Sequence, residues 1–429
     1  MIFGGLGELF VALTLVGCGS IAVADLALLY QLARYLVLRR SGLADEAMRL
    51  AKPLPSDAHL PHVVLQIPTF NEGTLVERSV ENAMRLDWPR DKLHIQICDD
   101  STDRTTAIAR AAAERATALG FDVTVFHRSS RRGFKAGSLH EAMNQSPHDY
   151  FAILDVDYIS PPDFLRRCMV VLLHGPRLAF VQARPDYLNS DANILTRAQT
   201  LILDYHYALE QAVRSWSHQA LPFNGTCGVW RREAIELGGG WRGESLTEDW
   251  ELSYHARLKG MRGMFITSVS AAGELPSNLD AWVPQQKRWA RGIGQVARMM
   301  LPRVFASQHL SLRERLGSIF PMALWLAYSV FTATYLAAIP ALILKPSWWL
   351  ALTIYLFYVA TYGIFCMLAF VGRVAAGRRT PVSHFLQGVA ALPVVCLYIS
   401  WIHLWVLPSI LLRRHRIFVR TPKRGAAPR

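Results

Sequence analysis

The sequence predicts an α/β domain with a mostly parallel sheet, flanked at both ends by apolar helices that could cross a membrane. Short β-type runs alternate with helical patterns between residues 62 and 157, as in βαβ units. Longer apolar runs occupy residues 9–38 and much of the chain beyond residue 317. The 429 residues are 52% hydrophobic, which excludes a disordered chain and indicates more than one small domain.

Four runs predict buried strands, and a helical pattern follows each of the first three. The strands are expected at 62–68, 93–100, 121–127 and 150–154, and the helices at 74–86, 104–119 and 135–145. Crossover connections of this kind place the carboxyl ends of parallel strands at one edge of the sheet, where ligands bind. The polar motifs "PTFNE", "DDSTD" and "DVD" follow three of the strands. A binding site is therefore predicted at that edge, and the absence of dinucleotide and P-loop glycine motifs disfavours those two ligand classes.

The first apolar run, residues 9–38, is long enough for one crossing of a bilayer, which takes about 20 residues. We favour a retained anchor over a cleaved signal peptide, because the basic residues Arg34, Arg39 and Arg40 follow in place of a small-residue cleavage site. By the positive-inside rule this end of the run faces the cytoplasm.

Two later apolar runs, 317–344 and 347–370, predict a membrane hairpin whose two ends both return to the cytoplasm. A further run, 385–412, has basic residues on both sides. Pro393 and Pro408 remove helix hydrogen-bond donors, so we expect a re-entrant or interfacial pair of short helices there in preference to a single crossing. This topology keeps the basic tail in the cytoplasm.

These runs divide the chain into four expected parts: an anchor helix and linker (1–44), a cytoplasmic domain (45–300), interfacial and transmembrane helices (301–412) and a basic tail (413–429). Lys and Arg near the membrane explain the net charge of +13 better than nucleic-acid binding does, because no zinc-finger or RNA-binding aromatic signature is present. The six scattered cysteines form no CxxC pair, which disfavours a disulfide framework and a zinc site.

The stretch "YFAILDVD" ends a predicted buried strand with Asp155 and Asp157. In a strand, residues i and i+2 point to the same side, so two carboxylates would meet and repel unless a cation joins them. Mg²⁺ and Mn²⁺ suit such a pair, since they prefer oxygen ligands and often share them with substrate phosphates. A short D-x-D is common by chance, but beside "DDSTD" it predicts a metal and diphosphate site.

The stretch "GESLTEDWELSYHARLKG" predicts a helix that Ser245 or Thr247 could cap. Glu248 and Asp249 lie in its first turn, where acidic residues also favour the helix dipole without any catalytic role. The alternative is a general base that takes a proton from an attacking hydroxyl group. The residues alone leave both interpretations open.

The stretch "WVPQQKRWARG" combines a cation with aromatic residues. Arg288 could bind a diphosphate with two hydrogen bonds, and Trp289 could offer an apolar face to a sugar ring. The alternative is an interfacial helix with an anchoring tryptophan. Lys135, at the turn into another predicted helix, is a further candidate for a phosphate or base contact.

The motifs "PTFNE", "DDSTD", "GFKAGSLHEAM", "DVD", "FNGTCGVWR", "TED" and "QQKRW" occur in the order and spacing of a known family. Together they resemble the family 2 inverting glycosyltransferases, and above all the cellulose-synthase-like A group and its bacterial relatives, which make β-linked glucans and mannans. The stretch "NSDANILTRAQTLILDYHYALEQ" is similar to that group too. The resemblance covers about residues 62 to 296 and implies a Rossmann-like glycosyltransferase A fold.

On the side of the nucleotide-sugar donor, the resemblance implies that Asp99 or Asp100 contacts the nucleoside and that Lys135 lies near the nucleotide. Asp155 and Asp157 would hold the diphosphate through Mg²⁺ or Mn²⁺. The tail stretch "FVRTPK" (418–423) is similar to a gating loop that closes over the nucleotide, with Arg420 in place of the family's valine. This similarity adds Thr421 and Lys423 to the expected donor contacts.

On the acceptor side, the resemblance makes Asp249 of "TED" the general base, with Glu248 beside it as a second catalytic candidate. The remaining matches would bind the diphosphate and the acceptor end (Gln285, Arg288 and Trp289) or line the acceptor site (Phe223, Asn224, Gly225 and Thr226).

The sequence thus predicts an integral membrane enzyme that transfers a hexose from a UDP- or GDP-sugar to a growing β-linked polysaccharide. We expect it in a bacterial inner membrane, in contact with lipids and with its catalytic domain in the cytoplasm. The first alternative is a glycolipid synthase that uses a ceramide or diacylglycerol acceptor. The second is a binding or scaffolding subunit with a degenerate site, which the complete set of motifs disfavours.

Overall fold

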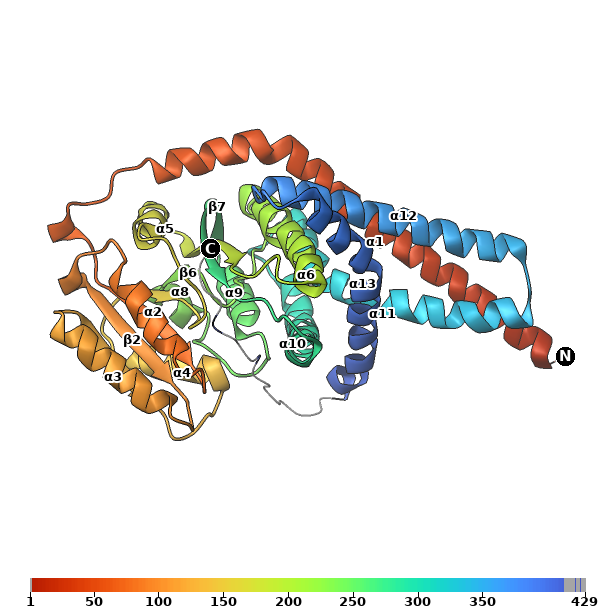
Figure 1. The fold of residues 1–429 in the computed structure, drawn as a ribbon. Coiled ribbons are helices and arrows are strands. Elements are labelled where there is room, and N and C mark those ends of the chain that lie inside the picture. The colour runs from red at the N-terminus through yellow and green to blue at the C-terminus, as the bar shows by residue number, and fades with distance from the viewer. Residues whose placement is uncertain (1, 413–420, 422–424, 426–429) are drawn as a thin grey trace.

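The computed structural model describes residues 2–412, 421 and 425. A seven-stranded sheet with helices on its faces lies at one end, and long apolar helices extend away from it (Figure 1). The N-terminus lies at the far end of those helices.

The first half of the sheet confirms the predicted alternation. The strands β1 (Val63–Thr69), β2 (Leu93–Asp99), β3 (Asp122–His127) and β4 (Tyr150–Ile153) alternate with α2 (Leu75–Met84), α3 (Thr105–Ala118) and α4 (Phe134–Asn144), and the short helices η1 (Asp57–His59) and η2 (Arg90–Lys92) precede β1 and β2. β1 pairs in parallel with β2 and β4, and β2 pairs in parallel with β3. Five consecutive residues of β1 are buried, which explains why the sequence reads as a continuous apolar run.

The second half mixes directions. Its elements are α5 (Phe164–Leu173), β5 (Leu178–Tyr187), α6 (Ile194–Asp204), the π-helical segment η3 (Tyr205–Gln211), α7 (Ala212–Trp216), β6 (Gly228–Arg231), α8 (Arg232–Leu237), α9 (Glu248–Leu258) and β7 (Arg262–Gly273). The strand order is β3-β2-β1-β4-β6-β5-β7. β6 runs antiparallel to both β4 and β5, while β5 and β7 are parallel. The sheet is therefore mostly parallel, as predicted.

Two apolar cores sandwich the sheet because successive residues of a strand face opposite sides. Leu65 of β1 packs with residues of α2, α3 and α5 on one side. Val64, its neighbour, packs with residues of α4, α8 and α9 on the other. Since both faces are covered, an open polar cleft can form only at the strand ends, and this restriction determines where a site can form.

The chain continues into α10 (Leu279–Ala306), α11 (Leu312–Leu344), α12 (Trp348–Ala375) and α13 (Val382–Leu411). Within the described residues, four helical segments are long and apolar enough to cross a membrane: Gly5–Leu50, Leu326–Leu344, Trp348–Ala375 and Val382–Leu411. α11 and α12 form the predicted hairpin, with a turn at residues 345–347.

The expectation that prolines divide the last apolar run is wrong, because α13 is one helix through Pro393 and Pro408. Its packing explains the continuity: one half contacts α6 and α10 through Leu392 and Val395, and the other contacts α10 through Val406. α13 runs crosswise to α1, α11 and α12 (Figure 1). Tertiary contacts of this kind hold a helix together where the prolines remove hydrogen bonds.

A single helix, α1 (Ile2–Leu50), joins the membrane region to the far side of the sheet (Figure 1). Near its C-terminus the Glu46 carboxylate is 1% exposed. It accepts hydrogen bonds of 2.7 to 3.1 Å from the backbone N–H and the hydroxyl group of both Thr267 and Ser268 in β7. This carboxylate therefore fixes the helix to the edge strand.

Replacing the anchor, Glu46→Ala, should destabilise the domain by about 3 kcal/mol, because four donor groups lose a charged acceptor. We expect a clearly lower apparent Tm in detergent by differential scanning fluorimetry. The matched control is Asp45→Asn, which removes an exposed i,i+4 ion pair with Arg49 and should cost about 0.5 kcal/mol or less. Equal shifts for the two variants would contradict the anchoring role of Glu46.

Candidate functional site

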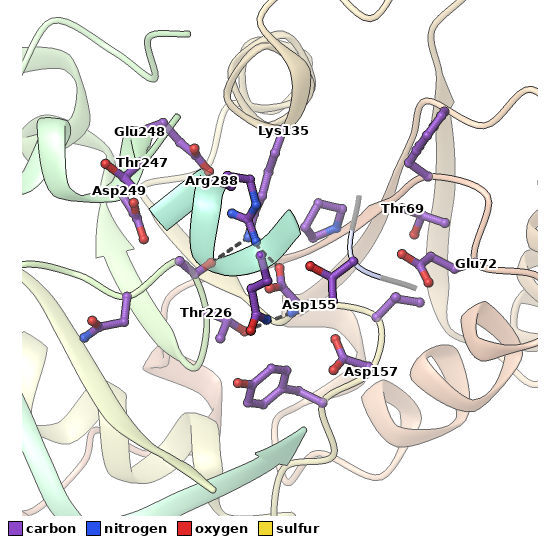
Figure 2. A pocket seen from close by; sticks show the side chains of 18 of the residues that line it. Thr69, Glu72, Lys135, Asp155, Asp157, Thr226, Thr247, Glu248, Asp249 and Arg288 are labelled. Atoms are coloured by element: carbon purple, nitrogen blue, oxygen red, sulfur yellow. Dashed lines mark hydrogen bonds and ion pairs between the residues drawn. The ribbon is translucent and has the colours of Figure 1, made fainter. Parts of the chain in front are cut away.

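A cleft with about 1340 Å³ of empty space, called here the main cleft, lies at the carboxyl ends of β1, β2 and β4, the edge that the sequence predicted. Figure 2 shows Glu248 and Asp249 on one side, Asp155 and Asp157 on the other, and Lys135 and Arg288 between them. Most of the predicted site residues line it: Asp100, Lys135, Asp155, Asp157, Asn224, Gly225, Thr226, Glu248, Asp249, Gln285, Arg288, Trp289 and Thr421.

Two predicted site residues do not line the main cleft, and a third lies outside the described residues. Asp99 is fully buried and accepts hydrogen bonds from Ser101 N–H and the Thr106 hydroxyl group, so its carboxylate orders the loop beneath the cleft. Phe223 is fully buried in an aromatic cluster with Phe180 and Trp230. Lys423 lies outside the described residues.

Asp155 follows Leu154, shortly after the end of β4, and the side chain of Lys135, at the start of α4, contacts the Asp155 carboxylate. The Lys135 ammonium donates to Asp155 Oδ1 at 2.5 Å and to the carbonyl oxygen of Gly225 at 2.8 Å. Burial lowers the pKa of Lys135, but the nearby carboxylates of Asp155 and Glu248 more than offset this, and its pKa is raised. The lysine is therefore a charged link between the β4 end and the loop before β6.

Asp155 and Asp157 lie in the turn after β4 and not within the strand, so the two-residue period does not by itself place them together. Both nevertheless line the main cleft. Asp157 Oδ2 accepts from the backbone N–H of Glu274 at 3.0 Å. In the part of the chain that the structure describes, no three His, Cys, Asp or Glu side chains could hold a metal ion. A divalent cation on this pair would need further oxygen ligands from a substrate.

Asp100 forms the end of the cleft nearest β2 and β3. Its carboxylate accepts from Arg128 Nε and Nη2, both at 2.7 Å, in a pair with each side chain 4% exposed. Arg128 also donates to Glu141 at 2.7 Å. Between the two aspartates that the sequence could not distinguish, Asp100 lines the cleft and Asp99 does not.

Glu248 and Asp249 occupy the first turn of α9, as predicted. Thr247 is at the N-cap position, but its side chain makes no capping hydrogen bond, so the expected cap is wrong. Burial raises the pKa of Asp249 to about 7, and the Glu248 carboxylate acts in the same direction. A carboxyl group with such a pKa can both take and release a proton near neutral pH.

Gly225 allows the two sides of the cleft to approach each other closely. Its φ is +77°, a conformation that suits glycine, and a Cβ there would lie 3.2 Å from Asp249 Oδ2 and 3.6 Å from Lys135 Nζ. Any larger residue would push apart the acid on α9 and the ammonium group on α4. Thr226, the next residue, accepts the backbone N–H of Asp155 on its hydroxyl oxygen at 2.9 Å.

α10 covers the cleft with Gln285, Arg288 and Trp289, which lie on consecutive turns. Burial lowers the pKa of Arg288, and the carboxylates of Glu248 and Asp249 oppose that effect. The guanidinium group therefore adds a second cation to the acidic cleft. Thr421 also lines the cleft, and Gly425 N–H donates to Glu274 Oε2 at 3.1 Å, so two described positions of the tail lie at the site.

A second space, called here the inner cavity, has about 1110 Å³ of empty volume, part of it open to solvent, and adjoins the main cleft at Asp249. It extends between η3, α10, α11 and α13, away from Asp155. The two spaces share a set of lining residues: Leu203, Tyr207, Asn224, Thr247, Asp249 and Trp289. Asp249 thus stands where the two spaces meet.

Sequence reasoning missed the η3 wall of the inner cavity, which includes His206, Tyr207 and Glu210. These residues belong to "DYHYALEQ", a stretch that resembles the family but received no role. The available signal in the sequence was a pair of polar residues, His206 and Glu210, that lie four positions apart within an apolar helical pattern. The π-helical geometry that turns them toward the cavity depends on tertiary packing.

Comparison with known proteins agrees with this geometry. Residues 61–292 match the model of the "Glycosyltransferase like family 2". The chain is 36% identical over 307 residues to glucomannan 4-beta-mannosyltransferase 9 of Arabidopsis thaliana, covering 69% of this chain and 58% of that protein. It is also 36% identical over 307 residues to glucomannan 4-beta-mannosyltransferase 1 of Oryza sativa, covering 68% and 59%. The chain thus spans about three fifths of the length of these curated relatives.

A solved structure supports the fold: a mannosyltransferase from Pyrobaculum calidifontis, in complex with GDP-Man and Mn²⁺, superposes with a TM-score of 0.58 at 18% identity. The alignment covers 90% of this chain and 99% of that one. The family model spans more than half of the 429 residues and contains the cleft residues from Asp100 to Trp289. This chain therefore belongs to glycosyltransferase family 2.

Proposed function

We propose that this protein is a membrane-bound inverting mannosyltransferase that extends a β-linked mannan or glucomannan from GDP-mannose. The similarity to glucomannan 4-beta-mannosyltransferases supports a 4-β-mannosyl product, and the solved neighbour's complex with GDP-Man supports GDP-mannose as the donor. The observation that carries the proposal is the position of Asp249: a half-buried carboxyl group of raised pKa at the junction of two spaces.

In the proposed reaction, the sugar of the donor lies between Asp155 and Asp249, and the acceptor enters from the inner cavity. Asp249 takes the proton of the acceptor hydroxyl group while that oxygen bonds to the anomeric carbon. The bond from this carbon to the diphosphate breaks on the opposite face, which inverts an α-linked donor to a β-glycoside. Lys135 and Arg288 stabilise the negative charge on the departing nucleoside diphosphate.

The residues present fit a divalent cation. Asp155 and Asp157 offer carboxylate oxygens on one wall, and a nucleotide sugar would supply phosphate oxygens. When bound, Mg²⁺ or Mn²⁺ neutralises charge on the diphosphate. Asp155 Oδ1 now accepts a hydrogen bond from the Lys135 ammonium group, so holding a cation there would require Lys135 to turn to another acceptor, such as a phosphate oxygen of the donor.

We further propose that the catalytic domain faces the cytoplasm, where nucleotide sugars are made, with a bacterial inner membrane as the predicted location. Basic residues that follow the apolar stretches of α1 and α12, among them Arg39 and Arg378, support this orientation. Thr421 at the cleft supports a tail on the same side as the domain.

The direct test uses purified protein in nanodiscs with GDP-mannose, UDP-glucose and other UDP- and GDP-sugars, with Mn²⁺ or Mg²⁺ and with EDTA. We expect transfer from GDP-mannose to β-1,4-mannooligosaccharides, a product cut by β-mannanase, and a loss of at least about a hundredfold in rate with EDTA that either metal reverses. A short, organic-extractable product that forms only with added lipid would establish the glycolipid alternative. Undiminished transfer in EDTA would contradict the metal site.

Asp249→Asn should lower kcat by about 10² to 10⁴, because the acceptor hydroxyl group loses its base. GDP-mannose affinity, measured by calorimetry, should persist. The variant should also be more stable than wild type, by a margin that grows from about pH 4 to about pH 7 and is complete above it, because in the wild type the folded state holds a proton to about pH 7 and the unfolded state only to about pH 4. Full activity would remove Asp249 from the mechanism, and lost donor binding would indicate misfolding.

The pH profile tests the same residue without mutation. Because the base must be deprotonated and burial raises the pKa of Asp249 to about 7, kcat/KM should rise with pH and level off above an apparent pKa near 7. Glu248→Gln should shift the rise to lower pH, because it removes a neighbouring negative charge. A flat profile between pH 5.5 and 8 would contradict the assignment.

A further inference from the structure

The η3 segment forms one wall of the inner cavity and is a π-helix of seven residues, Tyr205–Gln211, between α6 and α7. Its wider turns are less favourable than α-helical ones and are frequent at functional sites. His206 lies on this wall, with its side chain 22% exposed. It contacts a residue of the loop before β6 that lines both spaces, Asn224.

The hydrogen bonds around Asn224 fix the orientation of its amide. The carbonyl oxygen of Thr226 can only accept, so the side chain of Gln182 donates its Nε2 there at 2.8 Å. The Oε1 atom of Gln182 then accepts from Asn224 Nδ2 at 3.1 Å. Asn224 Oδ1 is left facing His206 Nε2 at 3.1 Å, and this oxygen can only accept.

The other ring nitrogen of His206 also faces an acceptor. Nδ1 lies 2.9 Å from Glu210 Oε2. Arg214, fully buried, donates to Oε1 of the same carboxylate from Nε and Nη2 at 3.1 and 2.9 Å. Burial raises the pKa of Glu210, but the charge of Arg214, which donates two hydrogen bonds to this carboxylate, is the largest of the effects that lower it. Glu210 is therefore ionised, and both nitrogens of His206 must carry hydrogen to make these two bonds.

We propose that His206 is held as an imidazolium and is a positioning residue for the acceptor sugar. It acts through Asn224, whose amide it orients at the opening between the main cleft and the inner cavity. The same loop carries Gly225 and Thr226, which contact Lys135 and the Asp155 backbone. A neutral ring would either set a lone pair against Asn224 Oδ1, so that the amide oxygen lost the hydrogen bond that holds it, or leave Glu210 Oε2 without its donor.

The position of the ring indicates that the acceptor depends on it more than the donor does. His206 lines the inner cavity and not the main cleft. Across the cavity stand Asp249 on α9, Tyr328 on α11 and His403 on α13, with Tyr207 beside it on its own element. A hydroxyl group that approaches Asp249 from the inner cavity therefore passes the Asn224 amide that His206 orients. This assignment deepens the proposed function and depends on it for the identity of the acceptor.

The kinetic test compares His206→Ala with His206→Gln, which keeps an N–H donor near the Nε2 position. Loss of a charged hydrogen bond predicts an acceptor KM about tenfold or more higher in His206→Ala, with the GDP-mannose KM changed less than about twofold. His206→Gln should recover most of the acceptor affinity. His309→Gln, on an exposed loop, is the matched control and should resemble wild type. Equal changes in both KM values, or no rescue by glutamine, would overturn the positioning role.

A second measurement needs no turnover and therefore separates this inference from the proposed function. In protein labelled with ¹⁵N-histidine, NMR should show one histidine with both ring nitrogens protonated near pH 7.5, and this signal should be absent from His206→Gln. A neutral tautomer at His206 would overturn the inference even in an active enzyme. If wild type transfers no mannose but His206 is an imidazolium with unchanged Asn224 contacts, the proposed function fails and the inferred charge state stands.

Discussion

The architecture of the site depends on the burial of like charges at one edge of the sheet. Asp155 after β4 and the neighbouring pair Glu248 and Asp249 in α9 converge there from two separate elements, and the cations near them are Lys135 and Arg288. Three carboxylates facing two cations would repel one another unless one of them kept a proton or a further cation arrived. The raised pKa of Asp249 and the fit of a divalent metal to Asp155 and Asp157 are two consequences of this imbalance.

The same imbalance explains why the domain needs firm external supports. A cleft that gathers like charges costs stability, and long-range polar contacts offset that cost at its margins. Arg378, in the connection between α12 and α13, makes a two-pronged hydrogen bond to Asp204 at the end of α6, with distances of 2.9 to 3.2 Å. Asp204 directly precedes η3. The membrane hairpin is therefore attached at the helix whose next turn forms the wall of the inner cavity, just as Glu46 attaches α1 to β7.

Much of the fold and of the site could be predicted because the apolar and polar patterns of the sequence match the positions of those residues in the folded domain. The strands β1, β2 and β4 read as apolar runs since both faces of the sheet are covered, and the polar motifs at their ends meet in one cleft. The sequence could not predict that β6 enters the sheet antiparallel, because a four-residue strand carries no signal of direction. It could not distinguish Asp99 from Asp100, or show that Phe223 packs in the core, since one residue of register decides both. The continuity of α13 and the π-helix at His206 depend on contacts with helices more than a hundred residues away.

The position of β6 also has a consequence for the order in which the chain folds. β4 lies beside a strand that begins at Gly228, and the Glu46 anchor joins residues 221 positions apart. Contacts between residues so far apart in the sequence form slowly, because closing the long loop between them costs conformational entropy. During synthesis α1 can enter the membrane long before β7 exists, so the nascent domain grows beside the bilayer with an unfinished sheet. The sheet is then completed and α1 docks late, in one cooperative event. Until that event, the side of β4 that will pair with β6 is exposed and can pair with other strands.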